Sequence, residues 1–279
     1  MTSRVPVLLL LLTIAFPLAA ADATRDGFVV VAGRTTGATR TFDTTLWLSN
    51  ATNHRADVTV SFLRGEQANP SPHALSLSIS AHGVAALPVA SNIIGAPEGL
   101  GALHVVASRD VAAEARITSS VAGDTSRKHA MTLRAIPSQY AIGSGESTAV
   151  QGVGSGEARL YVVETTGLPL YFTVTVVDAH GQEHGQKRWL LSGREQRAFD
   201  VQHEFPNAPA GAALLRIRGV NGSGKIVAAV VVTIPESQDL SVFEMLLPSR
   251  ARHRLGVGEL AAYALVALAI LAAVVRARR

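Results

Sequence analysis

The chain has no cysteine, has few charged residues, and outside its two ends has no segment with the period of an amphipathic helix. None of its 279 residues is cysteine, and only 16% are charged. The absence of thiols excludes disulfides, thiolate metal sites and cysteine nucleophiles. Any core in this chain must therefore be held together by apolar packing, which modules of about 110 residues can achieve.

Two apolar runs lie at the ends of the chain. Residues 1–21 carry Arg4, then an apolar stretch and several small residues, which predicts a secretory signal peptide cut after Ala21. Residues 258–275, apolar apart from Glu259, predict one transmembrane helix, followed by a basic cytoplasmic tail at residues 276–279. The alternatives are an uncleaved N-terminal anchor and a C-terminal helix buried in a core. With a signal peptide in place, the bulk of the chain is expected outside the cytoplasm.

The net charge of +4 comes from the two ends of the chain. Residues 250–279 hold six arginines and one glutamate, and the predicted signal holds Arg4, so residues 22–249 carry a net charge of −2. A weakly acidic segment is not the basic surface that binds nucleic acids. We therefore expect no nucleic-acid partner.

The segment between the apolar ends repeats itself. Residues 46–64 match residues 160–178 without a gap, and the match continues to residue 249 at offsets of 111 to 115. In both copies apolar residues occupy every second position of a strand-length segment, as a half-buried strand requires. The identical pairs in the opening stretch are Leu46/Leu160, Thr52/Thr166, Thr59/Thr173 and Val60/Val174. These matches predict a duplicated module.

The fold class follows from the spacing of the apolar runs. Short runs separated by Gly, Pro, Asn and Ser predict about seven or eight strands in each copy, including a turn at residues 108–110. We therefore predict an all-β protein of two tandem antiparallel β-sandwich modules of immunoglobulin-like type. The first module is placed at residues 26–145 and the second at residues 146–249, with the boundary near residue 145 in a Gly- and Ser-rich stretch.

One short segment fits a zinc-peptidase pattern. His180, Glu183 and His184 fit H-x-x-E-H, which in zinc peptidases places two imidazoles and a carboxylate on one helix face. That geometry needs helical spacing, whereas Gly181 and Gly185 lie in a segment that joins two alternating strands. We interpret the segment as a polar hairpin tip and expect no metal. The other histidines recur at no ligand spacing, and we expect them to be solvated.

A second segment fits a phosphate-binding loop. Residues 219–225 match G-x-x-x-x-G-K, but a true loop of this kind is followed by a hydroxyl side chain for magnesium and by a helix. Here Ile226 and a β-branched run follow. We interpret the segment as a glycine-rich hairpin and expect no nucleotide. No G-x-S-x-G elbow is present either, so we expect no cofactor, no catalytic residues and no enzymatic activity.

One strand differs between the two copies. In the first copy its outward face carries Glu114 and Arg116, whereas the aligned face in the second copy is entirely apolar. A strand that is apolar on both sides has to be covered by the other module, by an accessory strand or by a partner. The candidate packing or partner surface is Val227, Ala229 and Val231.

An aromatic residue recurs at one position of the repeat, as Trp47 and Tyr161. One aromatic side chain in the same place of each copy is typical of a core or of a sandwich edge. We prefer that interpretation to stacking on a sugar or a base.

The layout of signal peptide, tandem sandwich modules and C-terminal anchor resembles bacterial exported proteins with tandem immunoglobulin-like modules. The resemblance covers roughly residues 28–249, and it lies in an L-W-L-S-N strand, an alternating V-T-V-S-F strand and a later G-A-L strand. It implies a non-enzymatic, membrane-anchored protein that binds or scaffolds outside the cytoplasm, in the periplasm or at the cell surface, through sheet faces and strand edges. The expected partners are the membrane and a protein or polysaccharide of the cell envelope.

Two alternatives stand beside this interpretation. Residues 255–279 could be a sorting signal that is removed when the protein is attached to the cell surface. The chain could also be a periplasmic chaperone-like protein, because pilus chaperones pair two such domains. A metal-binding or hydrolytic enzyme that uses the histidine-bearing loops ranks below both.

Overall fold

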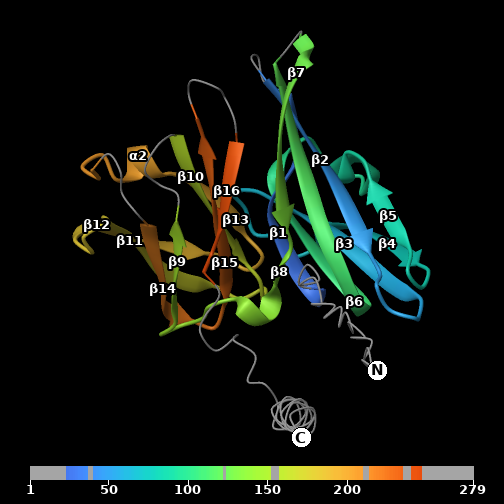
Figure 1. Ribbon diagram of the computed structural model, residues 1–279. Coiled ribbons are helices and arrows are strands. Elements are labelled where there is room, and N and C mark those ends of the chain that lie inside the picture. The colour runs from blue at the N-terminus through green and yellow to red at the C-terminus, as the bar shows by residue number, and fades with distance from the viewer. Residues whose placement is uncertain are drawn as a thin grey trace, which may run out of the picture. The chain divides into compact units, whose positions relative to one another are not determined.

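The structure is a computed structural model that describes residues 23–36, 40–121, 124–151, 157–209, 214–234 and 240–246. These residues form antiparallel sheets, and the helices among them are single turns (Figure 1). The prediction of an all-β protein is therefore confirmed. Within the described ranges no helix is long and apolar enough to cross a membrane. The predicted signal peptide, transmembrane helix and basic tail all lie outside these ranges.

The chain divides into two compact units. The first comprises Met1–Gly65 and Ser71–Pro137, and the second comprises Glu66–Pro70 and Ser138–Arg279. Residues 138–145, which the sequence assigns to the first module, thus belong with the second unit, where Ile142 forms a bridge to Ile226.

The first unit is one eight-stranded antiparallel sheet organised around a single long strand. The first half of β6 pairs with β3 and β1, and its second half pairs with β2 and β7. At 23 residues, β6 belongs to both halves of this sheet. The elements are β1 (Thr24–Thr36), β2 (Arg40–Ser49), β3 (Ala56–Arg64), β4 (His73–Ile79), β5 (Val84–Leu87), α1 (Ala90–Ile93), β6 (Gly99–Val121), β7 (Asp124–Arg134) and β8 (Ile136–Pro137).

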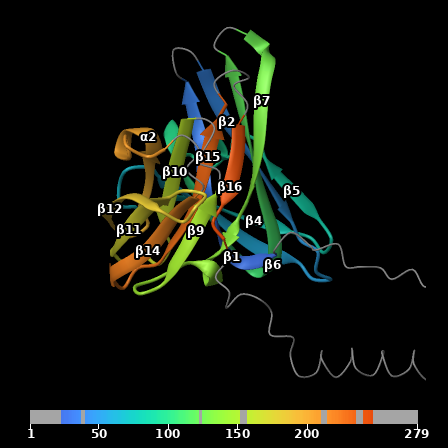
Figure 2. The ribbon, with the colours of Figure 1, turned by 60° about the vertical axis from the view of Figure 1, so that its left-hand side comes forward.

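The second unit has two separate four-stranded sheets, in the orders β12-β11-β14-β9 and β13-β10-β15-β16 (Figure 2). Aromatic side chains join the two sheets: the ring of Phe199 on β13 lies 4.5 Å from that of Trp189 on β12 and 6.1 Å from that of Phe172 on β11. The elements are η1 (Ser138–Tyr140), β9 (Ser147–Gln151), β10 (Glu157–Glu164), β11 (Leu170–Val177), β12 (Glu183–Leu191), β13 (Gln196–Asp200), α2 (Val201–Glu204), β14 (Leu214–Gly222), β15 (Ile226–Thr233) and β16 (Leu240–Glu244).

Strand order is the same in the two units, and the register agrees apart from local bulges. The order β4-β3-β6-β1 corresponds to β12-β11-β14-β9, and β5-β2-β6-β7 corresponds to β13-β10-β15-β16. Leu46 of β2 pairs with Leu87 and Ala115, and its repeat partner Leu160 pairs with Phe199 and Val230. The sequence repeat is therefore matched by equivalent hydrogen-bonded pairs.

The two units differ at one connection: β6 of the first unit is continuous, whereas its two halves correspond to the separate strands β14 and β15 in the second unit. The predicted turn at residues 108–110 is wrong, because these residues lie inside β6 with exposed side chains that an extended strand tolerates. In the second unit the corresponding residues separate β14 from β15. There Gly222 has a φ of +124°, and a Cβ at this position would lie 2.4 Å from the Pro169 carbonyl oxygen. Glycine permits this corner, whereas the glycine-free segment of the first unit continues as a strand.

Candidate functional site

The surface expected from the sequence, Val227, Ala229 and Val231, is buried. Val227 and Ala229 are fully buried and Val231 is 7% exposed. In the register of β10 and β15, Tyr161 lies opposite Ala229, so the recurring aromatic residue of the second copy is on this packed face. Burial raises the pKa of Tyr161 above its ordinary value. These side chains are packed rather than displayed, so an exposed partner surface has to lie elsewhere.

The zinc-peptidase pattern lies on a hairpin between β11 and β12. Its organiser is Asp178, whose carboxylate accepts hydrogen bonds from the backbone N–H groups of His180 and Gln182 and lies 2.8 Å from Nε2 of His184. The hydrogen bond to His184, followed by those from the backbone, lowers the pKa of Asp178 from 3.8 to about 2. Within the described residues, no three His, Asp or Glu side chains are placed to hold a metal ion.

The segment that matches the phosphate-binding pattern is a corner between two sheets, not the hairpin expected from the sequence. It joins β14 of one sheet to β15 of the other. The lysine of the pattern, Lys225, donates its backbone N–H to Oε1 of Glu164 at 3.1 Å. A strand follows the pattern instead of the helix N-terminus on which phosphate binding by such loops depends.

A fully buried carboxyl group organises this corner. Oε1 of Glu164 accepts hydrogen bonds from N and Oγ1 of Thr166 and from the Lys225 N–H, and Oε2 accepts them from the N–H groups of Gly167 and Arg194. Three turns therefore converge on one side chain. Because all five of these partners are donors from the protein, the carboxyl group is occupied by the fold rather than by a ligand.

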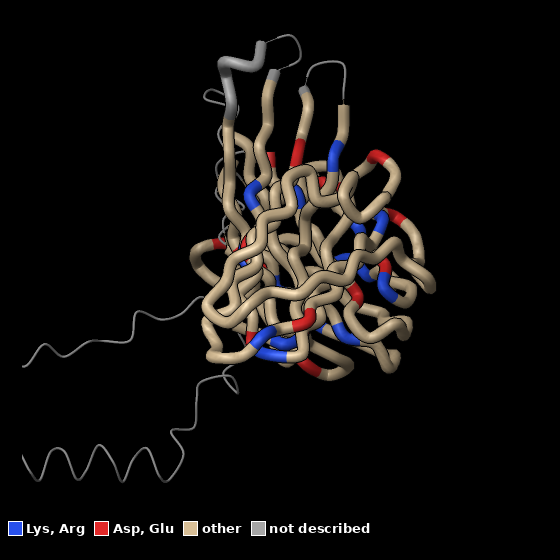
Figure 3. The backbone as a smooth tube through the Cα atoms, turned by 90° about the vertical axis from the view of Figure 1, so that its right-hand side faces the viewer, with Lys and Arg blue, Asp and Glu red and all other residues tan. Residues whose placement is uncertain are grey.

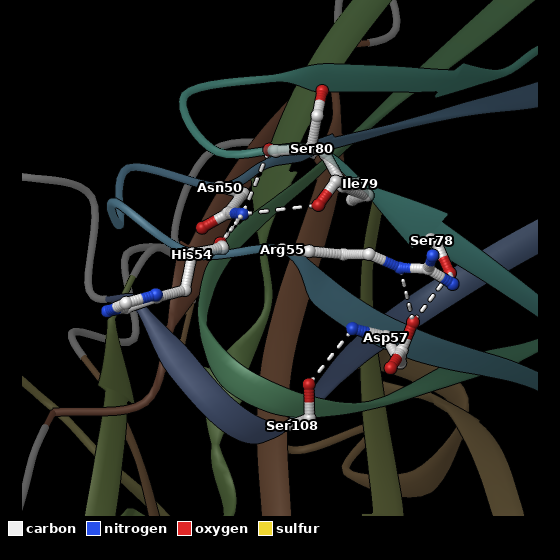
Figure 4. Close-up of polar contacts among 8 residues, drawn as sticks. All are labelled: Asn50, His54, Arg55, Asp57, Ser78, Ile79, Ser80 and Ser108. Atoms are coloured by element: carbon white, nitrogen blue, oxygen red, sulfur yellow. Dashed lines mark hydrogen bonds and ion pairs between the residues drawn. The ribbon is translucent and has the colours of Figure 1, made fainter.

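The equivalent position of the first unit is occupied by Asn50, which is 1% exposed. Its amide nitrogen donates to the carbonyl oxygens of His54, Ile79 and Ser80 (Figure 4). Its Oδ1 accepts from N and Oγ1 of Thr52. One buried polar side chain thus closes the turns in each unit. In the first unit it mainly donates hydrogen bonds, whereas in the second it only accepts them.

One histidine contradicts the expectation of a solvated side chain. His104 on β6 is 8% exposed, stacks on the ring of Phe28 with centroids 4.2 Å apart, and lies 2.8 Å from a carboxylate oxygen of Asp26. No pattern in the sequence indicates this stack, because it depends on the pairing of β1 with β6. The ring packs in the first unit as part of its core.

Trp47 and Tyr161, although repeat partners, lie in different environments. Buried and less buried residues alternate along β2, which leaves the Trp47 side chain half-buried on the outward side. There it lines an open groove of about 500 Å³ together with Glu114, Arg116, Ala130 and Thr132. The expected role in a core therefore holds for Tyr161, which is 5% exposed, but not for Trp47.

The outer face of β4, β3 and β6 in the first unit carries small hydroxyl side chains. Its centre is Thr59, paired with Ser76 on β4 and with Val106 on β6. The face lines an open groove of about 450 Å³ with Asp57 at one end. The hydroxyl of Ser78 donates to Asp57, as does Nε of Arg55 (Figure 4), and these hydrogen bonds lower the pKa of Asp57.

The corresponding outer face of β12, β11 and β14 in the second unit carries large cationic and apolar side chains. Its centre is Thr173, paired with Arg188 on β12 and with Arg218 on β14. Tyr171 lies opposite Leu190, and the guanidinium of Arg188 lies 4.6 Å from the centre of the Tyr171 ring. We name the set of outward residues the β11 face; it consists of Leu168, Tyr171, Thr173, Arg188, Leu190, Arg218 and Val220.

Sequence reasoning missed the β11 face, although a signal for it was present. Aligned outward positions change from Ser76 and Ser78 to Arg188 and Leu190, and from Asp57 to Tyr171. Such changes stand out only once the outward side of each strand is known. Over the described backbone as a whole, basic and acidic positions are interspersed (Figure 3).

Comparison with known proteins adds little. No protein-family description and no curated protein matches the chain. Among solved structures, the PBSX exported protein XepA has 11% identity and a TM-score of 0.22, with 76% of this chain and 84% of that chain covered. A protein described as secreted, from Parabacteroides distasonis, has 11% identity and a TM-score of 0.19, with 82% of each chain covered. At such TM-scores the likeness supports no argument about this chain.

Proposed function

We propose that the chain is an exported, membrane-tethered binding or scaffolding protein without enzymatic activity, built from two tandem immunoglobulin-like β-sandwich modules. The tether is the apolar run at residues 258–275, and the modules lie outside the cytoplasm. The observation that carries the proposal is the β11 face. There a duplicated scaffold keeps its strand order and register, yet places Tyr171, Arg188 and Leu190 where the other copy has Asp57, Ser76 and Ser78.

The chemistry of the β11 face supports recognition. Tyrosine and arginine are enriched at protein interfaces, and the energetically dominant contacts often come from them. Tyr171 is 40% exposed and Leu190 is 38% exposed, so apolar area is in contact with water beside a guanidinium. By contrast, the segments of the two enzyme-like patterns are held in turns by neighbouring carboxylates: Asp178 accepts hydrogen bonds within the hairpin, and Glu164 accepts one from Lys225 at the corner.

The proposed location and membrane anchoring are tested by fractionation and intact-mass measurement of the full chain expressed in a bacterial host. We expect a mature protein that begins after Ala21, retains Arg279, resists extraction with alkaline carbonate and is digested by protease added outside the plasma membrane. A soluble protein, or one protected from external protease, would refute the tethered address. Loss of residues 255–279 would instead support the surface-sorted alternative.

The binding role is tested by photo-crosslinking in living cells. A photoreactive phenylalanine is placed at Tyr171 or at the equivalent Asp57, both of which lie on exposed strand positions. We expect position 171 to capture a partner, either lipid or a protein of the envelope, and position 57 to capture none. Equal capture at both positions, or capture at neither, would remove the support for a binding role.

A further inference from the structure

The exposed apolar side chains of the β11 face gather at one end of its sheet. Leu168, Tyr171, Leu190 and Val220 are between 37% and 48% exposed. Tyr171 lies between Leu190 on one neighbouring strand and Asn221 on the other, and Val220 is the extra residue of the bulge beside it. Leu168 lies two residues before β11 begins. Four apolar side chains from three strands and a turn therefore form one patch.

Two free guanidinium groups adjoin this patch. Arg188 and Arg218 flank Thr173 on opposite strands, which places their Cα atoms about 10 Å apart. Within the described residues, neither makes a hydrogen bond or ion pair through its side chain, and Arg188 only stacks on Tyr171. Arg216, on the same side of β14, is paired with Glu183 at 2.5 Å. The separation of Arg188 and Arg218 suits several anionic groups in one plane rather than a single bound ion.

We propose that the β11 face lies against the surface of an anionic phospholipid bilayer. Leucine, valine and tyrosine side chains partition into the region between headgroups and acyl chains, while arginines form bidentate hydrogen bonds with lipid phosphates. The face thus offers both kinds of contact that interfacial binding combines. The equivalent face of the first unit has one exposed apolar side chain, Val106, among hydroxyl groups, and its arginine, Arg55, is paired with Asp57.

The course of the chain favours a bilayer over other anionic surfaces. The described residues end at Leu246, whose N–H donates to the carbonyl oxygen of Ala149 on β9, the strand that pairs with β14 in the same sheet. The apolar run begins at residue 258, and the intervening eleven residues span at most about 40 Å. The inference rests on the proposed binding role, and the proposed tether would hold the β11 face within reach of lipid at high effective concentration.

The absence of cysteine makes the test direct. Leu190→Cys, and Ser78→Cys as its matched control, are labelled with an environment-sensitive nitrobenzoxadiazole dye in the full chain. Each is reconstituted into vesicles of phosphatidylcholine alone, or of phosphatidylcholine with phosphatidylglycerol. We expect the dye at position 190 to shift to shorter wavelength and to be quenched by doxyl-labelled lipid only when phosphatidylglycerol is present. The dye at position 78 is expected to show neither change.

The arginines provide a second measurement. Arg188→Gln and Arg218→Gln are each expected to weaken the phosphatidylglycerol-dependent response roughly fivefold, and high salt is expected to reduce it further. Circular dichroism checks that the variants keep the β-structure. A response that these changes leave intact would overturn the inference.

Other outcomes separate the competing occupants and the tether. A dye shift that depends on protein concentration and not on lipid charge would identify a second copy of the chain as the occupant and overturn the inference. A dye shift on addition of an acidic peptide, with no response to phosphatidylglycerol, would favour a protein partner and also overturn it. Alkaline carbonate extraction tests independently whether the chain is anchored in the membrane. A chain that is extracted and still responds to phosphatidylglycerol would refute the tether and keep the inference.

Discussion

The first unit and the second unit share one strand order but close their turns with different buried side chains. Asn50 closes the turns of one with three donated hydrogen bonds, and Glu164 closes those of the other by accepting five. The long strand β6 continues where the glycine corner separates β14 from β15. The outward face of the central strands changes from hydroxyls to arginine, tyrosine and leucine. Strand order is thus kept by apolar packing, whereas buried polar groups and outward positions are free to diverge.

The two tryptophans allow each unit to be monitored separately. Trp47 lies in the first unit and Trp189 in the second, and the chain has no others. Trp189→Phe therefore reports the unfolding of the first unit, and Trp47→Phe that of the second. Each substitution below is made in the background that reports its own unit, and urea unfolding is followed by fluorescence.

The largest expected difference lies in the cores. Phe172, fully buried against Trp189 and Phe199, corresponds to the smaller Val58. Phe172→Ala is expected to lower the free energy of unfolding of the second unit by about 4 kcal/mol, because it leaves a large cavity. Val58→Ala is expected to cost the first unit about 2 kcal/mol. Equal losses would mean that the aromatic contacts do not hold the two sheets of the second unit together.

The buried polar residues come next. Glu164→Gln replaces one carboxylate oxygen, which accepts hydrogen bonds, with an amide NH₂ group that faces the same N–H donors. We expect the free energy of unfolding of the second unit to fall by about 3 kcal/mol. Asn50→Asp removes the donor to three carbonyl groups, and we expect a loss of about 2 kcal/mol in the first unit. If either variant unfolds like its parent, the proposed role of these side chains in closing the turns is wrong.

The glycine corner is expected to contribute less. Gly222→Ala places a Cβ at a φ of +124° and against the Pro169 carbonyl, which is expected to cost about 2 kcal/mol. Arg109→Ala, in the strand that replaces this corner in the first unit, is expected to stay within about 0.5 kcal/mol. A tolerated alanine at position 222 would show that the corner does not need its left-handed backbone.

The smallest effect is a pH dependence confined to the β11–β12 hairpin. The pKa of Asp178 in the folded chain, about 2, is below its ordinary value of 3.8. The carboxylate therefore stabilises the hairpin fully above pH 3.8, and this contribution is lost as the pH falls through about 2. Titration by nuclear magnetic resonance should give that midpoint, and His184→Gln should move it towards 3.8. An unchanged midpoint in the variant would assign the shift to the backbone donors alone.

The all-β class could be predicted from the sequence because it depends on alternation, which is local. The residues Leu46 and Leu160, which the repeat matches, have equivalent strand partners in the structure, and both face a core. The turn predicted at Ser108 was wrong, because polar residues suit an exposed strand as well as a turn. Where neither glycine nor proline is present, composition does not separate the two.

The environment of individual side chains was harder to predict. Trp47 and Tyr161 occupy one position of the repeat, yet only Tyr161 is packed, because burial of a sheet face depends on what covers it. The sequence presents Val227, Ala229 and Val231 as a strand face that needs covering, and it could not tell packing from partner binding. The β11 face was missed since its arginines, read along the chain, look like ordinary solvated residues.

The most direct test of the central claim, that binding resides on the β11 face, is to exchange this face between the units and measure vesicle and partner binding. Tyr171→Asp, Arg188→Ser and Leu190→Ser give the second unit the side chains of the first. Asp57→Tyr, Ser76→Arg and Ser78→Leu make the reciprocal change. We predict that the first triple variant loses binding while the urea midpoint of its unit is unchanged, and that adding the reciprocal changes restores binding. Binding that survives the first exchange would contradict the account.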